Sequence, residues 1–124
     1  MFNVLVVEDN RDLAEVLGYC FTMKDMKAHV ACSMFGAIRI YDTSVKIDAI
    51  VCDFNLGDGT APELITRLGR RAPKVKFLYS GTQFTAKQHP GFSEYLLKPI
   101  DFDILRSKMY KHLKGGSHEN RVGC

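Results

Sequence analysis

Residues 2–21 read FNVLVVEDNRDLAEVLGYCF, an apolar run followed by polar residues and then by spaced apolar residues. The run Asn3–Val7 is rich in β-branched residues, which is typical of a strand buried on both faces. Over Arg11–Met23 apolar residues recur at helical spacing, and Asn10 is placed to cap the helix. The apolar stripe consists of Leu13, Val16, Leu17, Cys20 and Phe21. The stretch therefore predicts a strand followed directly by an amphipathic helix.

The same alternation continues along the chain. Further apolar runs predict strands at Ala28–Cys32, Ala49–Cys52, Val75–Tyr79 and Tyr95–Leu97. Spaced patterns predict helices at Met34–Tyr41, with Ser33 as its cap, at Pro62–Leu68 and at 102–113. Strands that alternate with helices favour a parallel sheet between helices. We therefore expect a flavodoxin-like, doubly wound α/β fold with strand order 2-1-3-4-5. Its crevice opens at the carboxyl ends of strands one and three.

One segment interrupts the alternation. Residues 81–94 read GTQFTAKQHPGFSE at the place where a fourth helix belongs, and they show no helical stripe. Pro90-Gly91 would end any helix that began earlier. We expect this helix to be short or missing, with one or two turns at most around Thr85–His89.

The bulk composition indicates an ordinary globular domain in the cytoplasm. The chain has 124 residues, 46% hydrophobic and 25% charged, with a net charge of +3. Its basic residues are scattered and no apolar stretch approaches membrane-spanning length, so we expect neither nucleic acid nor membrane as a partner. The cysteines, Cys20, Cys32, Cys52 and Cys124, form no C-x-x-C pair and are predicted to be reduced. We expect a domain over residues 1–114 and a flexible tail or linker stub over 115–124.

Polar residues follow four of the predicted strands. Glu8-Asp9 follows strand one, Asp53 strand three, Ser80 strand four and Lys98-Pro99 strand five. These ends meet at one edge of a parallel sheet, where three carboxylates would repel one another unless a hard cation such as Mg²⁺ joined them. Asp53 could then act as a nucleophile that forms an acyl phosphate. Mg²⁺, the Lys98 ammonium and the Ser80 hydroxyl would neutralise the phosphoryl oxygens.

Four segments carry a resemblance to a known family. They are VVEDN at 6–10, CDFNLGDG at 52–59, LYSGT at 78–82 and YLLKP at 95–99. In this order and spacing they resemble the receiver domain of two-component response regulators, over about residues 2–113. The resemblance implies a phospho-acceptor that takes a phosphoryl group from a sensor histidine kinase or a histidine phosphotransfer protein. It implies signalling through protein–protein contacts and not a turnover enzyme.

The resemblance also implies a role for each acid. Asp53 corresponds to the phosphorylation site, and Glu8 and Asp9 to the acidic pair that organises Mg²⁺. Asn55, two residues after Asp53, would offer its backbone carbonyl to the metal.

The remaining site residues follow from the last two segments. Ser80 corresponds to the family's switch residue, Lys98 to its phosphate-binding lysine and Pro99 to a cis-proline. Tyr95 corresponds to an aromatic residue that turns inward when Ser80 moves, and a plain core role is the alternative for it.

The sequence departs from the family pattern between strands four and five. Ser80 and Lys98 are 18 residues apart, shorter than the family norm by about one helical turn. The missing helix normally belongs to the output and dimerisation face, so we expect an atypical output face. Gly57 and Ala61 replace a commoner proline and glycine, which is a milder change.

Two other functions stay open. An aspartyl-phosphate phosphatase of the haloacid-dehalogenase type also uses an Asp after a strand, but it needs a second Asp where Asn55 stands, and the late acidic pair is lacking. A receiver-shaped module that is never phosphorylated would act through 81–94 alone. The chain is expected to be either a stand-alone receiver or the N-terminal piece of a longer regulator.

Overall fold

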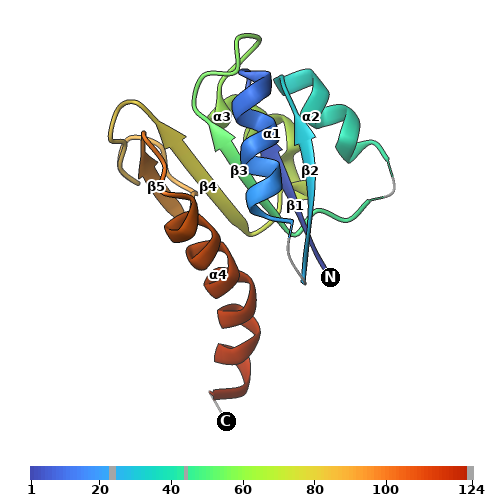
Figure 1. Cartoon of the computed structure of the whole chain (residues 1–124), viewed down its shortest axis with the longest axis vertical. Helices are drawn as coiled ribbons and strands as arrows, with labels where there is room; N and C mark the ends of the chain where they lie inside the picture. The colour runs from blue at the N-terminus through green and yellow to red at the C-terminus, as the bar shows by residue number, and fades with distance from the viewer. Residues whose placement is uncertain (23–24, 44, 123–124) are drawn as a thin grey trace.

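A parallel sheet forms the centre of the chain (Figure 1). The structure is a computed structural model that describes residues 1–22, 25–43 and 45–122, of which 116–122 are described by their backbone only. Within these ranges the strands are β1 (Phe2–Val7), β2 (Met26–Ala31), β3 (Ala49–Asp53), β4 (Val75–Ser80) and β5 (Glu94–Leu97). Their order is β2-β1-β3-β4-β5, and every neighbouring pair is parallel. The predicted flavodoxin-like fold is confirmed.

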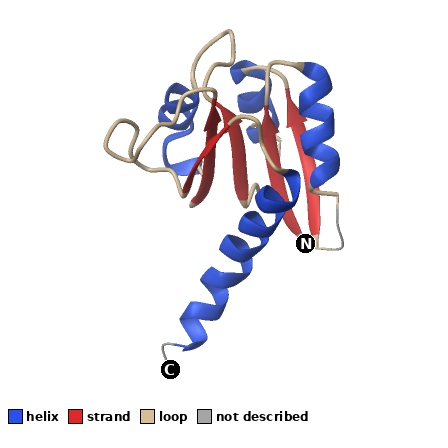
Figure 2. Cartoon of the chain, turned by 60° about the vertical axis from the view of Figure 1, so that its left-hand side comes forward, coloured by secondary structure: helices blue, strands red, loops and turns tan. Residues whose placement is uncertain are grey.

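Helices cover both faces of the sheet (Figures 1 and 2). They are α1 (Arg11–Cys20), α2 (Met34–Tyr41), α3 (Ala61–Leu68) with the short 3₁₀ turn η1 (Gly69–Arg71), and α4 (Phe102–Val122). The first three begin at side-chain caps, where Asn10, Ser33 and Thr60 accept hydrogen bonds from backbone N–H groups three residues on. The predicted caps at Asn10 and Ser33 are confirmed.

Alternate residues of each strand enter two different cores, because successive side chains of a strand point to opposite faces. Val4 and Val6 of β1 pack with α1 and α4, through Leu17, Phe21, Leu105 and Met109. Leu5 and Val7 pack with α2 and α3, through Met34, Ala37, Leu64 and Leu68. A strand buried on both faces explains why β1 and β3 are continuous apolar runs.

Two helix ends differ from prediction. Helix α1 ends at Cys20, where the N–H groups of Phe21 and Thr22 donate to carbonyls three residues back; Met23, the predicted end, lies outside the described residues. Helix α4 continues to Val122, past the predicted end at 113. The glycines at 115 and 116 disfavour a helix, but their low propensity does not end it here. The role of 115–124 as a linker stays a prediction. None of the helices described here is long and apolar enough to cross a membrane.

The apolar stripe of α1 is narrower than predicted. Leu17 and Phe21 are buried, but Val16 is 47% exposed beside Tyr19. The helix presents one face to the sheet, and no described element covers the flank on which Val16 lies.

The segment 81–94, all of which is described, forms no helix. Residues 81–93 are a loop in which the N–H groups of Gln88 and His89 both donate to the Thr85 carbonyl, and Glu94 begins β5. This confirms the prediction that the fourth helix is short or missing. Figure 2 shows the segment as a loop beside the sheet.

Candidate functional site

The carboxyl ends of β1 and β3 bring three acids together. Glu8, Asp9 and Asp53 each offer a carboxylate oxygen, and these oxygens all lie within 4.8 Å of one another. The two strands are direct neighbours in the sheet, with Val7 paired to Cys52, so the residues that follow must meet. Glu8 and Asp53 are buried and Asp9 is exposed. We call this cluster the acidic edge.

Glu8 is the most enclosed member of the acidic edge, with 1% of its surface exposed. Its Oε2 accepts a hydrogen bond from the backbone N–H of Asn10 at 3.0 Å, and its Oε1 accepts one from the Tyr79 hydroxyl at 2.7 Å. Burial raises the pKa of the Glu8 carboxyl, although these two hydrogen bonds oppose the change. The site therefore holds a carboxylate whose charge is costly without a further cation.

Lys98 faces the acids from the end of β5. Its Nζ lies 3.1 Å from Asp53 Oδ2 and 3.9 Å from Glu8 Oε1. The Lys98 N–H donates to the Ser80 carbonyl, which continues the pairing of β5 with β4, and the Lys98–Pro99 peptide bond is cis. One ammonium is thus shared unequally between two carboxylates.

Tyr79 is a site residue that the sequence analysis did not identify. It is fully buried, lies opposite Asp53 in the β3–β4 register and donates its hydroxyl to Glu8. Burial, together with the neighbouring Glu8 charge, raises the pKa of the Tyr79 phenol, so it remains a donor. Strand alternation could have found it, since a tyrosine next to a strand end, on the face of the acids, needs a partner for its hydroxyl.

The other predicted site residues make local contacts. Ser80 Oγ accepts from the Thr82 N–H at 3.2 Å, and Asn55 Oδ1 accepts from the Gly57 N–H at 3.0 Å. Tyr95 lies on the face of α2 and α3, where it packs against that core. By alternation along β4, Ser80 points to the opposite face from Tyr79. The structure therefore brings Glu8, Asp9, Asp53 and Lys98 together. The side chains of Ser80, Asn55 and Tyr95 make other contacts.

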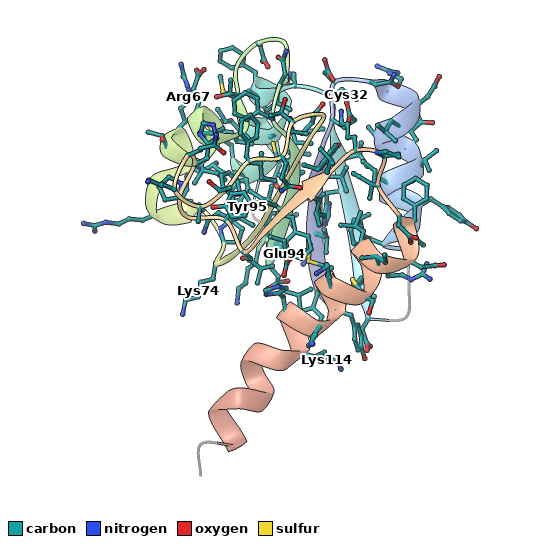
Figure 3. The ribbon with its side chains drawn as sticks, turned by 90° about the vertical axis from the view of Figure 1, so that its left-hand side faces the viewer. Cys32, Arg67, Lys74, Glu94, Tyr95 and Lys114 are labelled. Atoms are coloured by element: carbon teal, nitrogen blue, oxygen red, sulfur yellow. The ribbon has the colours of Figure 1, made fainter. Side chains whose placement is uncertain are left out.

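The segment 81–94 packs its aromatic side chains beside the acidic edge, and we call it the aromatic loop. The rings of Phe54, Phe84 and His89 lie with centroids 4.7 to 5.1 Å apart. The Tyr95 hydroxyl donates to the His89 carbonyl and accepts from the Phe92 N–H. Figure 3 shows Tyr95 next to this loop, with Glu94 nearer α4. Phe54 directly follows Asp53 in the chain. The ring that the aromatic loop contacts is therefore one peptide bond away from the acidic edge.

The chemistry of the donor set suits a hard divalent cation. Three carboxylates that converge on one point offer only oxygen, which Mg²⁺ prefers, and part of their charge is left uncompensated by a single lysine. Asp53 has one carboxylate oxygen in this cluster and the ammonium of Lys98 beside its Oδ2.

The family model described as the response regulator receiver domain matches residues 4–110. The chain belongs to this family. Receiver domains are signalling modules of two-component systems and not turnover enzymes. No curated protein sequence matches the chain.

Solved receiver domains have the same fold. One from Methanospirillum hungatei is 16% identical with a TM-score of 0.82, and the match covers 96% of this chain and 98% of that one. One from Methylobacillus flagellatus is 24% identical with a TM-score of 0.76, over 90% and 98%. A response regulator from Thermotoga maritima, solved in complex with Mg²⁺-BeF, is 19% identical with a TM-score of 0.75, over 90% and 98%.

Proposed function

We propose that Asp53 accepts a phosphoryl group from phosphohistidine and that the acyl phosphate is the signal of this receiver domain. The observation that carries the proposal is the convergence of three carboxylates with Lys98 Nζ 3.1 Å from Asp53 Oδ2. The donor is a sensor histidine kinase or a histidine phosphotransfer protein. An Asp53 oxygen bonds to phosphorus while the P–N bond breaks, and the imidazole keeps the electron pair of that bond.

Glu8, Asp9 and Asp53, with the backbone carbonyl of Asn55, would hold Mg²⁺. The bound ion supplies positive charge to the oxygens of the phosphoryl group. Lys98 is placed to neutralise a second oxygen, because its ammonium already lies beside Asp53. We assign the third oxygen to the Ser80 hydroxyl at the end of β4, which would turn toward the phosphoryl group from the opposite face of the strand, as the switch role requires. The bound ion would also offset the buried charge of Glu8.

The aromatic loop is the output face that we propose for this receiver. Phe54 links the loop to Asp53, and Tyr95, to which we assign the switch role together with Ser80, holds the His89 carbonyl. A change at the phosphorylated aspartate would therefore loosen or repack the loop. The test is hydrogen exchange of residues 83–92 with and without acetyl phosphate and Mg²⁺. Equal exchange in a phosphorylated sample would contradict this output route.

The proposed setting is the cytoplasm, with protein partners and with neither nucleic acid nor membrane as a target. This follows from the scattered basic residues and from the family's place in signalling. Each chain should take up one phosphoryl group and not turn over a phosphomonoester.

The deciding experiment is the intact mass after incubation with acetyl phosphate and Mg²⁺. We expect a gain of about 80 Da, the mass of one phosphoryl group, that depends on the metal. Asp53→Asn should abolish the gain. Asp58→Asn is the matched control, since Asp58 lies in the same loop but binds the N–H groups of Met34 and Phe35, and it should keep the gain. A gain that persists in Asp53→Asn would reassign the phosphorylation site.

A further inference from the structure

We infer that the Tyr79 hydroxyl keeps Lys98 on Asp53 by occupying the Glu8 oxygen that Lys98 would otherwise bind. Tyr79 is in this sense a positioning residue of the metal and phosphoryl site. The inference rests on the proposed function, because it concerns the same carboxylates.

The first step is the hydrogen bonding of Glu8. Both carboxylate oxygens have a neutral donor, Oε1 the Tyr79 hydroxyl at 2.7 Å and Oε2 the Asn10 N–H at 3.0 Å. A neutral donor holds the carboxylate in place without cancelling its charge, so that charge stays available to a cation. Glu8 is buried and has little access to water as an alternative donor.

The second step is the position of Lys98. Its Nζ is bonded to Asp53 Oδ2 at 3.1 Å but stands off Glu8 Oε1 at 3.9 Å, and it lies 5.2 Å from the centre of the Tyr79 ring. The flexible lysine stem lets the ammonium move by the small distance that separates the two carboxylates. Because the Tyr79 hydroxyl already donates to Oε1, Glu8 gains less from the ammonium than Asp53 does.

Without that hydroxyl, Glu8 Oε1 would be a buried, charged oxygen lacking a hydrogen bond. Such a group is costly, and the nearest charged donor is Lys98. The ammonium would then move onto Glu8, where it would compete with Mg²⁺ for that carboxylate, and Asp53 would lose its charged partner. Metal affinity would fall although no predicted metal ligand has changed.

The test is a titration of the Tyr79→Phe variant with Mg²⁺, monitored by NMR or by calorimetry, in the absence of any phosphodonor. Phenylalanine keeps the ring and the packing and removes only the hydroxyl. We expect the dissociation constant for Mg²⁺ to rise about tenfold, the usual scale for loss of a group that positions a metal ligand. Should Tyr79→Phe not fold, Tyr79→Leu, which also lacks the hydroxyl, must show the same rise.

Tyr41→Phe is the matched control. The Tyr41 hydroxyl is also buried, yet it has no hydrogen-bond partner among the described residues, and it belongs to α2. Its loss should leave the dissociation constant for Mg²⁺ unchanged.

A double-mutant cycle with Lys98→Met identifies the cause. If Tyr79 acts by restraining Lys98, then Tyr79→Phe should have little effect on Mg²⁺ affinity in the Lys98→Met background. An equal dissociation constant in Tyr79→Phe and the unsubstituted protein, or a full effect in the Lys98→Met background, would overturn the inference alone. An unsubstituted protein that binds no Mg²⁺ would overturn the proposed function and this inference together.

Discussion

The acidic edge and the aromatic loop lie side by side at the carboxyl end of the sheet, and they are stabilised by opposite means. In the acidic edge, three carboxylates face one another and burial raises the pKa of Glu8. At the aromatic loop, the rings of Phe84 and His89 make tilted or edge-on contacts with each other and with Phe54, and the Tyr95 hydroxyl donates to the His89 carbonyl. The first region therefore carries unbalanced charge, and the second is held by aromatic contacts and hydrogen bonds to the backbone.

The difference separates chemistry from transmission. A cluster of like charges costs folding free energy and is useful only when a cation or a phosphoryl group binds there. Aromatic contacts stabilise the fold in any state and can repack at modest cost. Substitutions in the acidic edge should therefore change reactivity more than stability, and substitutions in the aromatic loop should do the reverse.

The largest expected effect is that of Lys98→Met on phosphorylation. Removing the ammonium beside Asp53 should slow the gain of mass with acetyl phosphate about 100-fold at saturating Mg²⁺, as loss of one charge-stabilising group commonly does. Lys108→Met is the control, because Lys108 pairs with Glu94 at 3.3 Å, away from the acids. Equal rates for the two variants would place Lys98 outside the reaction.

Phe84→Ala tests the other side of the comparison. It removes the ring that contacts both Phe54 and His89, and we expect a loss of about 1 to 2 kcal/mol in the free energy of unfolding. The rate of phosphorylation of Asp53 by acetyl phosphate should stay close to that of the unsubstituted protein. Urea unfolding and mass spectrometry measure the two quantities, and a large fall in rate with little loss of stability would reverse the assignment of roles.

Glu8→Gln should stabilise the metal-free protein. A carboxyl with a raised pKa binds its proton more tightly in the folded state, so stability falls as pH rises from the ordinary pKa through the raised one. At neutral pH the variant should melt about 3 °C higher without Mg²⁺. The difference should vanish at acidic pH, where Glu8 is protonated. A lower melting temperature at neutral pH would show that Glu8 is not a costly charge.

The smallest effect concerns Asp58, which lies between the two regions in sequence. Desolvation raises its pKa, but the hydrogen bonds that its carboxylate accepts from backbone N–H groups, those of Met34 and Phe35 foremost, together outweigh this and lower the pKa overall. This stabilisation is present above the ordinary pKa of Asp and is lost as pH falls through the lowered one. Asp58→Asn should cost about 0.5 kcal/mol at neutral pH and nothing in strong acid. Thermal unfolding of the variant and the unsubstituted protein at several pH values measures this loss. A difference in stability that is the same at neutral and at acidic pH would contradict the prediction.

Much of the fold could be predicted because its signals are local. Continuous apolar runs predicted β1 and β3, and cap residues predicted the starts of α1 and α2. The absence of a helix in 81–94 followed from Pro90-Gly91 and from the lack of a stripe. Helix ends were predicted less well. Helix α4 passes its glycines and continues to Val122, because the helix propensity of single residues is only a weak guide to where a helix ends.

The site was predictable only in part. That Glu8, Asp9, Asp53 and Lys98 meet follows from the order of the strands, since the ends of parallel strands share one edge. Alternation places the side chains of Tyr79 and Glu8 on one face of the sheet, but the hydrogen bond between these residues, 71 positions apart, is decided by tertiary packing. The same holds for the Phe54, Phe84 and His89 rings.

The sequence by itself determined which strand carries which charged residue, because alternation and strand order are encoded in short apolar patterns. The tertiary structure decided which donor satisfies each buried oxygen. That choice depends on differences of less than about 1 Å between side-chain distances, such as 3.1 Å from Lys98 to Asp53 and 3.9 Å to Glu8, and such differences are set by packing of the whole domain.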